Sequence, residues 1–219
     1  MRTILGRLRK RFGSLEPPRR VDPLEELVLT VLSQHTSDLN ADRAFAALRA
    51  RYPTWDRVLA AEPAELADTI RSGGLADTKA PRIQAILREI LDREGSWDLS
   101  WTAEASDAAI RDYLTSLPGV GPKTAAVVLS FALGRDALPV DTHVHRVTRR
   151  LGLIGPRTSA EVADRLLHDL VPDGSRVPLH VGLIRLGREI CKAGTPLCSI
   201  CPLQDLCPSA EPPARRRRA

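Results

Sequence analysis

Hydrophobic residues recur along this chain with the spacing of α-helices. Over residues 80–92 one helical stripe carries Ile83, Ile86, Leu87, Ile90 and Leu91. Apolar positions at i, i+3, i+4 and i+7 predict a helix with one buried face. No run alternates between apolar and polar residues as a half-buried strand does. The pattern therefore predicts an all-α protein.

The same pattern predicts a series of further helices. The first is a buried helix over residues 24–32, which the polar stretch S-Q-H-T-S-D-L-N follows. The others are predicted over residues 41–50, 64–70, 106–114, 122–133, 144–151, 159–170 and 179–190. Ser106 is a typical capping residue, Pro122 suits a first helical position, and Gly134 suits a helix end.

The net charge of +5 is distributed unevenly along the 219 residues. Residues 1–20 carry a net charge of +6 and residues 208–219 carry +3, so the remainder carries −4. Basic ends of this kind suit a polyanionic partner, although solvated, disordered ends explain them equally. No stretch approaches the 18 apolar residues of a membrane span, and the basic N-terminus lacks a secretory signal. We therefore expect a cytoplasmic protein without membrane contact.

The stretch S-L-P-G-V-G-P-K-T-A-A-V-V predicts two helices joined by a tight glycine turn. Gly119 and Gly121 permit backbone angles closed to other residues and a close approach of another backbone. The amides of Val120, Gly121 and the following turn are helix-start donors, which we expect to be unpaired and to bind an anion such as a DNA phosphate. The alternative is an ordinary helix–helix turn, because such turns also favour glycine.

Lys123 follows this turn and is a candidate nucleophile. A free lysine has a pKa of about 10.4, so only roughly 1 in 2,500 is neutral at pH 7. The positive end of a helix dipole disfavours the ammonium by about 0.3–1 kcal/mol, and partial desolvation would have to supply the rest. Without a partner, Lys123 would serve as a phosphate contact or a solvated side chain.

Asp141, in L-P-V-D-T-H-V, is the candidate partner of Lys123. A helix over residues 122–133 would be roughly 18 Å long, and the six residues 135–140 can span about 20 Å. The chain can therefore return along the helix and bring Asp141 beside Lys123. A carboxylate there could accept a proton or stabilise cationic charge on a sugar. Asp141 could also cap the helix that begins near Thr142.

All four cysteines lie within 17 residues, with the spacing C-x6-C-x2-C-x5-C. They are Cys191, Cys198, Cys201 and Cys207. Such a group indicates one metal centre or two disulfides, and disulfides are disfavoured in the cytosol. Structural zinc usually uses two C-x2-4-C pairs, of which only one is present. The wider loops favour a [4Fe–4S] cluster held by four thiolates.

These three motifs, in this order, resemble the endonuclease III family of DNA base-excision glycosylases. They cover residues 117–207, and L-S-Q-H-T-S-D and G-G-L-A-D-T-K-A extend a weaker likeness to about residue 25. The resemblance implies a six-helix barrel domain over 19–135, with the helix-hairpin-helix at about 106–133. An iron–sulfur domain would combine 1–18 with 136–208, and 209–219 would form a basic disordered tail. A DNA-binding cleft would lie between the two domains.

The resemblance also implies a reaction on duplex DNA that contains damaged pyrimidines or abasic sites. The base would be flipped out of the helix, Lys123 would attack the sugar to give a Schiff base, and Asp141 would assist departure of the base. β-Elimination would then cut the strand. It implies a monomer, which we expect to be cytoplasmic and associated with the bacterial nucleoid.

Further residues are implied to contact DNA. Gln34 and His35 occupy the segment that fills the gap left by the flipped base, and Leu75 corresponds to the intercalating wedge. Packing is the alternative for Leu75, and solvation the alternative for the basic face of Arg146, Arg149 and Arg150. The complete implied set is Gln34, His35, Leu75, Gly119, Val120, Gly121, Thr124, His143 and Arg146.

The sequence departs from the family pattern at three places. His35 stands at the gap-filling position, so either Gln34 or His35 could fill the gap. Ala76 replaces an aromatic residue common in the family, which leaves a smaller wedge. The loop K-A-G-T-P-L carries only Lys192, which predicts a shallower salt dependence of DNA binding than in relatives with several cations there.

Two other functions remain compatible with parts of this pattern. A monofunctional glycosylase of the same fold would act on mismatched or alkylated bases, but such enzymes generally lack the lysine. A non-catalytic DNA-binding module would use the helix-hairpin-helix only to hold DNA. Trapping of a covalent adduct between enzyme and DNA separates both from a glycosylase with lyase activity.

Overall fold

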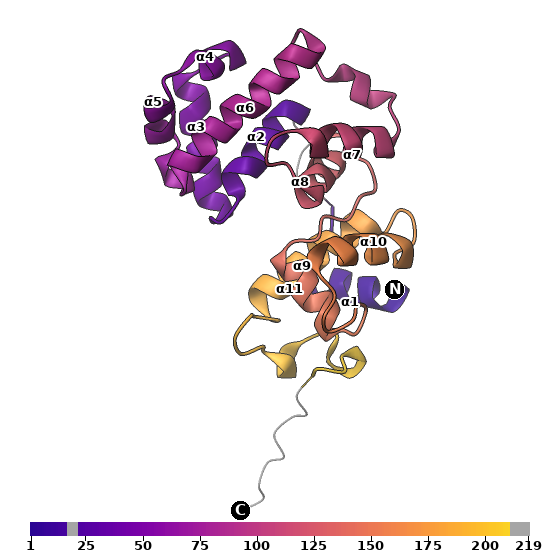
Figure 1. The fold of residues 1–219 in the computed structure, drawn as a ribbon. Coiled ribbons are helices and arrows are strands. Elements are labelled where there is room, and N and C mark those ends of the chain that lie inside the picture. Colours follow the sequence, from indigo (N-terminus) through magenta and orange to yellow (C-terminus); the bar gives the residue numbers. More distant parts are fainter. Residues whose placement is uncertain (17–21, 211–219) are drawn as a thin grey trace, which may run out of the picture. The chain divides into compact units, whose positions relative to one another are not determined.

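The computed structural model describes residues 1–16 and 22–210, and it is helical throughout. Figure 1 shows the helices and their connecting loops, and no strand occurs among the described residues. The all-α prediction is confirmed. No helix among these residues is long and apolar enough to cross a membrane. The Arg-rich segment 215–218 lies outside the described residues.

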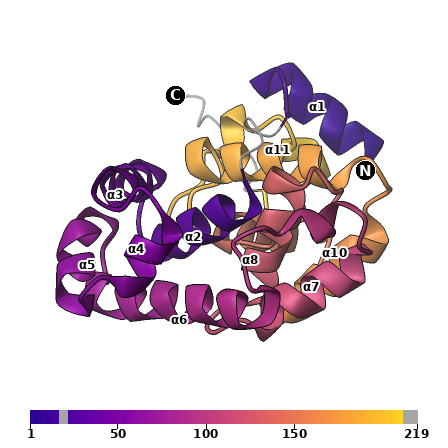
Figure 2. The same cartoon turned by 90° about the horizontal axis from the view of Figure 1, so that it is seen from above.

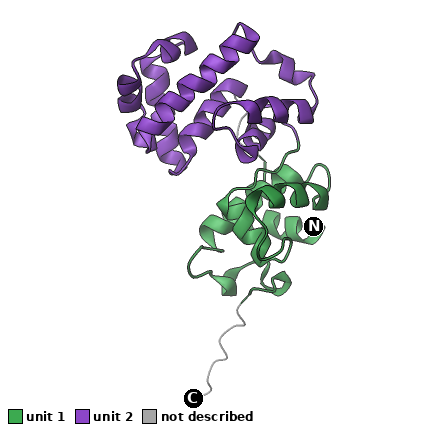
Figure 3. Ribbon diagram, viewed as in Figure 1, with its two compact units in different colours: residues 1–18, 136–219 green, residues 19–135 purple. Residues whose placement is uncertain are grey.

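The chain forms two compact units, which are coloured separately in Figure 3. One unit is continuous, Arg19–Arg135, and the other combines Met1–Pro18 with Asp136–Ala219. The chain leaves the second unit after its N-terminal helix and returns to it at residue 136.

The continuous unit contains seven α-helices and three shorter helical turns among its described residues. The α-helices are α2 (Pro23–Ser33), α3 (Asp38–Arg51), α4 (Trp55–Ala60), α5 (Pro63–Thr69), α6 (Ala76–Glu94), α7 (Asp107–Ser116) and α8 (Pro122–Val127). The shorter turns are η1 (Arg71–Gly73), η2 (Ser100–Ala103) and η3 (Val128–Ala132), the last of which is a π-helix.

α2 is the central helix of this unit. It contacts α3, α6 and α8, and Figure 2 shows it between α3 and α8. Burial of apolar side chains on both sides explains why residues 27–32 of α2 are all apolar except Thr30. α6 packs with the predicted stripe, since Ile83, Ile86, Leu87 and Ile90 are all inaccessible to solvent.

Hydroxyl side chains cap the N-termini of several helices. Ser106 caps α7 as predicted, because its Oγ accepts a hydrogen bond from the Ala109 amide at 3.2 Å. Thr54 caps α4 in the same way through the amide of Arg57, at 3.4 Å. α4 has only six residues and was not predicted, since so short a segment shows no clear period.

The discontinuous unit contains the remaining described helices. They are α1 (Arg2–Phe12), α9 (Thr142–Arg150), α10 (Ala160–Leu170), α11 (Arg176–Glu189), η4 (Cys198–Ile200) and η5 (Gln204–Leu206). The core of the unit packs apolar residues of α1, α9, α10 and α11 together with Leu203 beside the cysteines.

α1 corrects the interpretation of the N-terminus as solvated and disordered. Ile4, Leu5 and Leu8 are buried, and α1 packs against α11. The approach is close at Gly182, where an added Cβ would lie 2.9 Å from Leu8 Cδ1. The basic residues of α1 therefore lie on the outer face of an amphipathic helix.

Candidate active site

Two turns in the continuous unit hold non-glycine residues in a left-handed backbone conformation. Among the described residues, only His35 (φ 56°) and Leu75 (φ 49°) combine a side chain with positive φ. This conformation costs energy, and it is concentrated at functional sites. His35 is exposed, and Leu75 is 58% exposed although it is apolar. Packing, the alternative for Leu75, does not explain this exposure.

A buried lysine links these two turns. Lys79 is only 2% exposed, and its Nζ donates to the carbonyl of Leu32 at 2.6 Å and to that of Gly73 at 2.7 Å. Leu32 lies just before the His35 turn, and Gly73 just before Leu75. Burial, and then the nearby positive charge of Arg82, lowers the pKa of Lys79.

The glycine turn between α7 and α8 has the expected backbone. Gly119 adopts φ 71°, Gly121 precedes the helix, and Pro122 is its first residue. The Val120 amide was expected to be unpaired, but it donates to the carbonyl of Leu117 at 3.1 Å. Val120 is also buried, as is Thr124, so neither side chain faces solvent. Any contact of Val120 with DNA therefore uses atoms other than its amide hydrogen.

Lys123 is half-buried and is the second residue of α8. α8 packs against α2, which carries Glu26. Burial raises the pKa of Glu26, while a hydrogen bond from Thr30 Oγ1 at 3.3 Å and the charge of Lys123 act in the opposite direction. The carboxylate of Glu26 and the ammonium of Lys123 thus act on each other across the α2–α8 contact.

Asp141 caps α9. Its Oδ1 accepts a hydrogen bond from the Val144 amide at 2.7 Å, which confirms the capping role. The bond fixes the carboxyl group, and it leaves Oδ2 outside this contact. Lys123 belongs to the continuous unit and Asp141 to the discontinuous one, so their meeting stays a prediction.

Arg146 and His143, both predicted to contact DNA, lie together on α9. Arg146 Nη2 is 3.1 Å from His143 Nδ1 and donates to the carbonyl of Gly187 at 2.9 Å. Arg146 Nε donates to the carbonyl of Cys191 at 3.0 Å. These bonds join α9 to α11 and to the first cysteine, so Arg146 is not the solvated side chain that the alternative proposed.

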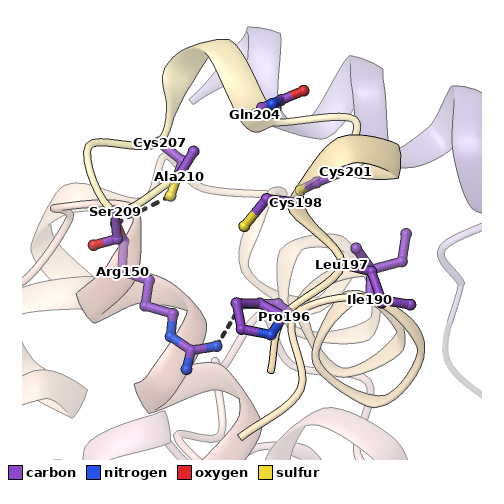
Figure 4. Close-up of a pocket in the computed structure, with 11 residues that line it drawn as sticks. Arg150, Ile190, Pro196, Leu197, Cys198, Cys201, Gln204, Cys207, Ser209 and Ala210 are labelled. Carbon is purple, nitrogen blue, oxygen red and sulfur yellow. Dashed lines mark hydrogen bonds between the residues drawn. The ribbon is translucent and has the colours of Figure 1, made fainter. Parts of the chain in front are cut away.

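The four cysteines line one pocket at the end of the discontinuous unit (Figure 4). All four are half-buried thiols without disulfides, so the disulfide alternative is not realised. Among the described residues, no three His, Cys, Asp or Glu side chains are placed to share one metal ion. Burial raises the pKa of Cys201 and of Cys207, and the other thiolates raise both further by repulsion. Positively charged iron would offset that repulsion, so the donor set fits a cluster.

Arg150 connects α9 to the cysteine loop. Its Nη1 donates to the carbonyl of Lys192 at 2.7 Å and to Cys191 Sγ at 3.3 Å. Its own carbonyl accepts a hydrogen bond from Cys207 Sγ at 3.2 Å. Arg150 therefore holds the first and last cysteines from one position, a role that the sequence interpretation missed.

Comparison with known proteins places these features in one family. A model described as HhH-GPD superfamily base excision DNA repair protein matches residues 28–173. Endonuclease III of Thermotoga maritima is 37% identical over 189 residues, which cover 86% of this chain and 84% of that relative. Endonuclease III of Bacillus subtilis is 37% identical over 186 residues, which cover 85% and 81%. The chain belongs to the endonuclease III family.

The predicted family resemblance is therefore confirmed, and solved structures of endonuclease III agree with it. One described as a trapped endonuclease III–DNA covalent intermediate has a TM-score of 0.82 and 34% identity, covering 95% of this chain and 94% of that one. A non-covalent endonuclease III–DNA complex has a TM-score of 0.80 at the same identity and coverage. A further model, described as the iron-sulfur binding domain of endonuclease III, matches residues 191–207. The predicted [4Fe–4S] cluster is thereby confirmed.

The sequence did not predict three polar residues that lie near these turns or near Lys123. They are Glu26, Lys79 and Arg82. Lys79 left a signal, because it lies one turn before Ile83 on the buried stripe of α6. A cation at such a position usually has a buried acceptor. Glu26 and Arg82 left none, since Lys123 and Gln34, with which they interact, are far from them in sequence.

Proposed function

We propose that this member of the endonuclease III family removes oxidised pyrimidines from duplex DNA and then cuts the strand at the abasic site, with Lys123 as the nucleophile. The observation that carries the proposal is a half-buried lysine at the start of α8, directly after the turn at Gly119. The solved structure of a covalent endonuclease III–DNA intermediate supports the same chemistry. The fold and the family match support base-excision repair of DNA as its setting.

The reaction begins at the anomeric carbon of the flipped nucleotide. The neutral amine of Lys123 bonds to C1′, and the base leaves with the electron pair of the glycosidic bond and takes up a proton. Opening of the sugar ring gives a protonated Schiff base between C1′ and Nζ. Loss of a proton from C2′ then expels the 3′ phosphate, and hydrolysis releases Lys123.

Asp141 is proposed to stabilise the positive charge that develops on the sugar as the base leaves. Its position is fixed by the hydrogen bond from the Val144 amide to Oδ1. A fixed carboxylate costs little reorganisation during the reaction, which is the condition for strong electrostatic stabilisation. Oδ2 would face the reacting nucleotide.

The exposed turns are proposed to open the duplex. Leu75 would enter the stack as a wedge, because its exposed apolar side chain is held in a strained backbone conformation. The turn of Gln34 and His35 would fill the vacated space. Gly119 and Gly121 would approach the DNA backbone, and His143 would lie near it. The [4Fe–4S] cluster would hold residues 191–207 in their fold.

Borohydride trapping on abasic DNA tests the nucleophile. Wild-type protein is expected to form a covalent adduct, and Lys123→Gln is expected to form none while DNA binding stays within a few-fold. Asp141→Asn is expected to slow the reaction by about 10²–10³-fold, the range for removal of one electrostatically stabilising group. Lys10→Gln, exposed on α1, is the matched control. An adduct with Lys123→Gln would refute the assignment.

The substrate class and assembly state need their own measurements. We expect excision from duplexes that carry a single oxidised pyrimidine and none from a mismatched or alkylated base. We expect a monomer in sedimentation, acting on the bacterial nucleoid in the cytoplasm. Excision of the mismatched base alone would favour the monofunctional alternative.

A further inference from the structure

Arg82 connects two of the DNA-facing turns through contacts within the continuous unit. It lies on α6, and its Nη1 donates to the side-chain oxygen of Gln34 at 2.9 Å. The Nε side of the same guanidinium group lies against Gly119, where an added Cβ would be 2.6 Å from Nε and 2.8 Å from Cδ. The side chain therefore bridges the turn after α2 and the turn before α8.

No ion pair accounts for the position of the Arg82 side chain. It is half-buried, and no carboxylate lies within salt-bridge distance of it in the described part of the chain. The charged group that it acts on is Lys79, a second cation whose pKa it lowers. Placing a partly buried cation beside another cation costs free energy. Arg82 therefore does not serve electrostatic stabilisation of the fold, and its hydrogen bond to Gln34 indicates its role.

The bridge distinguishes Gln34 from His35. The Gln34 side chain is half-buried and bonded to Arg82, whereas the next residue, His35, is exposed and has φ 56°. No hydrogen bond from the His35 side chain is found among the described residues. One side chain of the turn is thus anchored inward, and its neighbour is presented outward.

We infer that Arg82 is a positioning residue: by anchoring Gln34 to the hairpin, it holds the turn in which His35 enters the gap left by the flipped base. This inference rests on the proposed function. It assigns the gap-filling role to His35, which the sequence left open between His35 and Gln34. An imidazole ring can stack on the neighbouring bases and donate to the orphaned base.

A duplex that cannot react tests this role separately from the chemistry. It carries a tetrahydrofuran abasic analogue opposite 2-aminopurine, whose fluorescence reports how the orphaned base is stacked. Dissociation constants are measured at one salt concentration, and fluorescence is measured with saturating protein. The outcome does not depend on the trapping experiment. If trapping on natural abasic DNA failed, the proposed function would be refuted, but binding and fluorescence with this duplex could still be measured.

Five variants give the expected results. His35→Ala is expected to weaken binding by about fivefold or more, the scale of one lost stacking contact, and to change the fluorescence at saturation. Arg82→Met and Gln34→Ala are expected to weaken binding by similar factors, and their double variant is expected to be no weaker than either single variant. Arg82→Lys, which can still donate to Gln34, is expected to recover part of the loss.

The control is Arg88→Met, an exposed arginine on the same helix, for which we expect unchanged binding and fluorescence. Thermal unfolding of every variant separates loss of the fold from loss of the bridge, because saturation fluorescence reports only folded complexes. Two results would overturn the inference. One is a double variant whose loss of affinity equals the product of the two single losses, and the other is a His35→Ala variant with wild-type binding and fluorescence.

Discussion

At the residue scale, the protonation state of Lys123 is the decisive property of the proposed enzyme. The charges near its amine therefore control its activity, and Glu26 is one of them. A carboxylate beside a lysine favours the ammonium, which is not nucleophilic. Glu26 therefore opposes the chemistry wherever its carboxyl group is ionised, because it lowers the fraction of neutral amine.

Replacing Glu26 by Gln is expected to move the rising limb of the pH profile of borohydride trapping to lower pH. The reason is that the amide removes the negative charge that favours the ammonium form of Lys123. Glu25→Gln is the matched control, because Glu25 is the preceding residue on α2 and lies 3.7 Å from Arg49 instead. A limb that moves to higher pH would show that Glu26 accepts a proton in the reaction.

At the element scale, α6 organises the three turns that face DNA in the proposal. Lys79 ties the turn of His35 to the turn of Leu75, and Arg82 ties Gln34 to the hairpin at Gly119. The two cations lie three residues apart and therefore on the same face of the helix. A single helix thus sets the spacing of the wedge, the gap-filling turn and the hairpin.

Lys79→Met is expected to lower the free energy of unfolding by about 1–3 kcal/mol at neutral pH, because two carbonyls lose their donor in a buried site. The difference from wild type is expected to widen as the pH rises towards about 10.4. Burial lowers the pKa of Lys79 in the folded state, so the unfolded state binds the proton more tightly and wild-type stability rises with pH.

Denaturant unfolding across this pH range measures the effect. Lys10→Met, on the exposed face of α1, is the control and is expected to show neither the loss nor the widening. A difference that is constant with pH would mean that the ammonium of Lys79 is not desolvated.

The helices that determine this arrangement were predictable from periodicity, but the links between them were not. The stripe of Ile83, Ile86 and Ile90 gave α6, and Ser106 gave the start of α7. The pairing of Arg82 with Gln34 joins residues 48 positions apart, and no local pattern reports such a contact. The free amide expected at Val120 was wrong because the turn closes its own hydrogen bond to Leu117.

At the scale of the whole molecule, the two ends of the chain complete one unit. Arg7 on α1 forms an ion pair with Asp205, and its Nη1 donates to the carbonyl of Pro202 at 3.2 Å. Both partners lie between the third and fourth cysteines. This helix was not predicted, because the seven cations of the first 20 residues indicated a solvated segment. The buried face of the helix consists of only three apolar residues, Ile4, Leu5 and Leu8.

α1 is therefore expected to stabilise the fold that holds the [4Fe–4S] cluster. Leu8 is inaccessible to solvent and packs against α11 at Gly182, so Leu8→Ala is expected to cost about 2–5 kcal/mol. The visible absorbance of the cluster should then be lost at a lower temperature than in wild type. Leu39→Ala, which removes a leucine that is 59% exposed, should leave that temperature unchanged. If Leu8→Ala lowered global stability but left cluster loss unchanged, the cysteine loop would be held by Arg146 and Arg150 on α9 without help from α1.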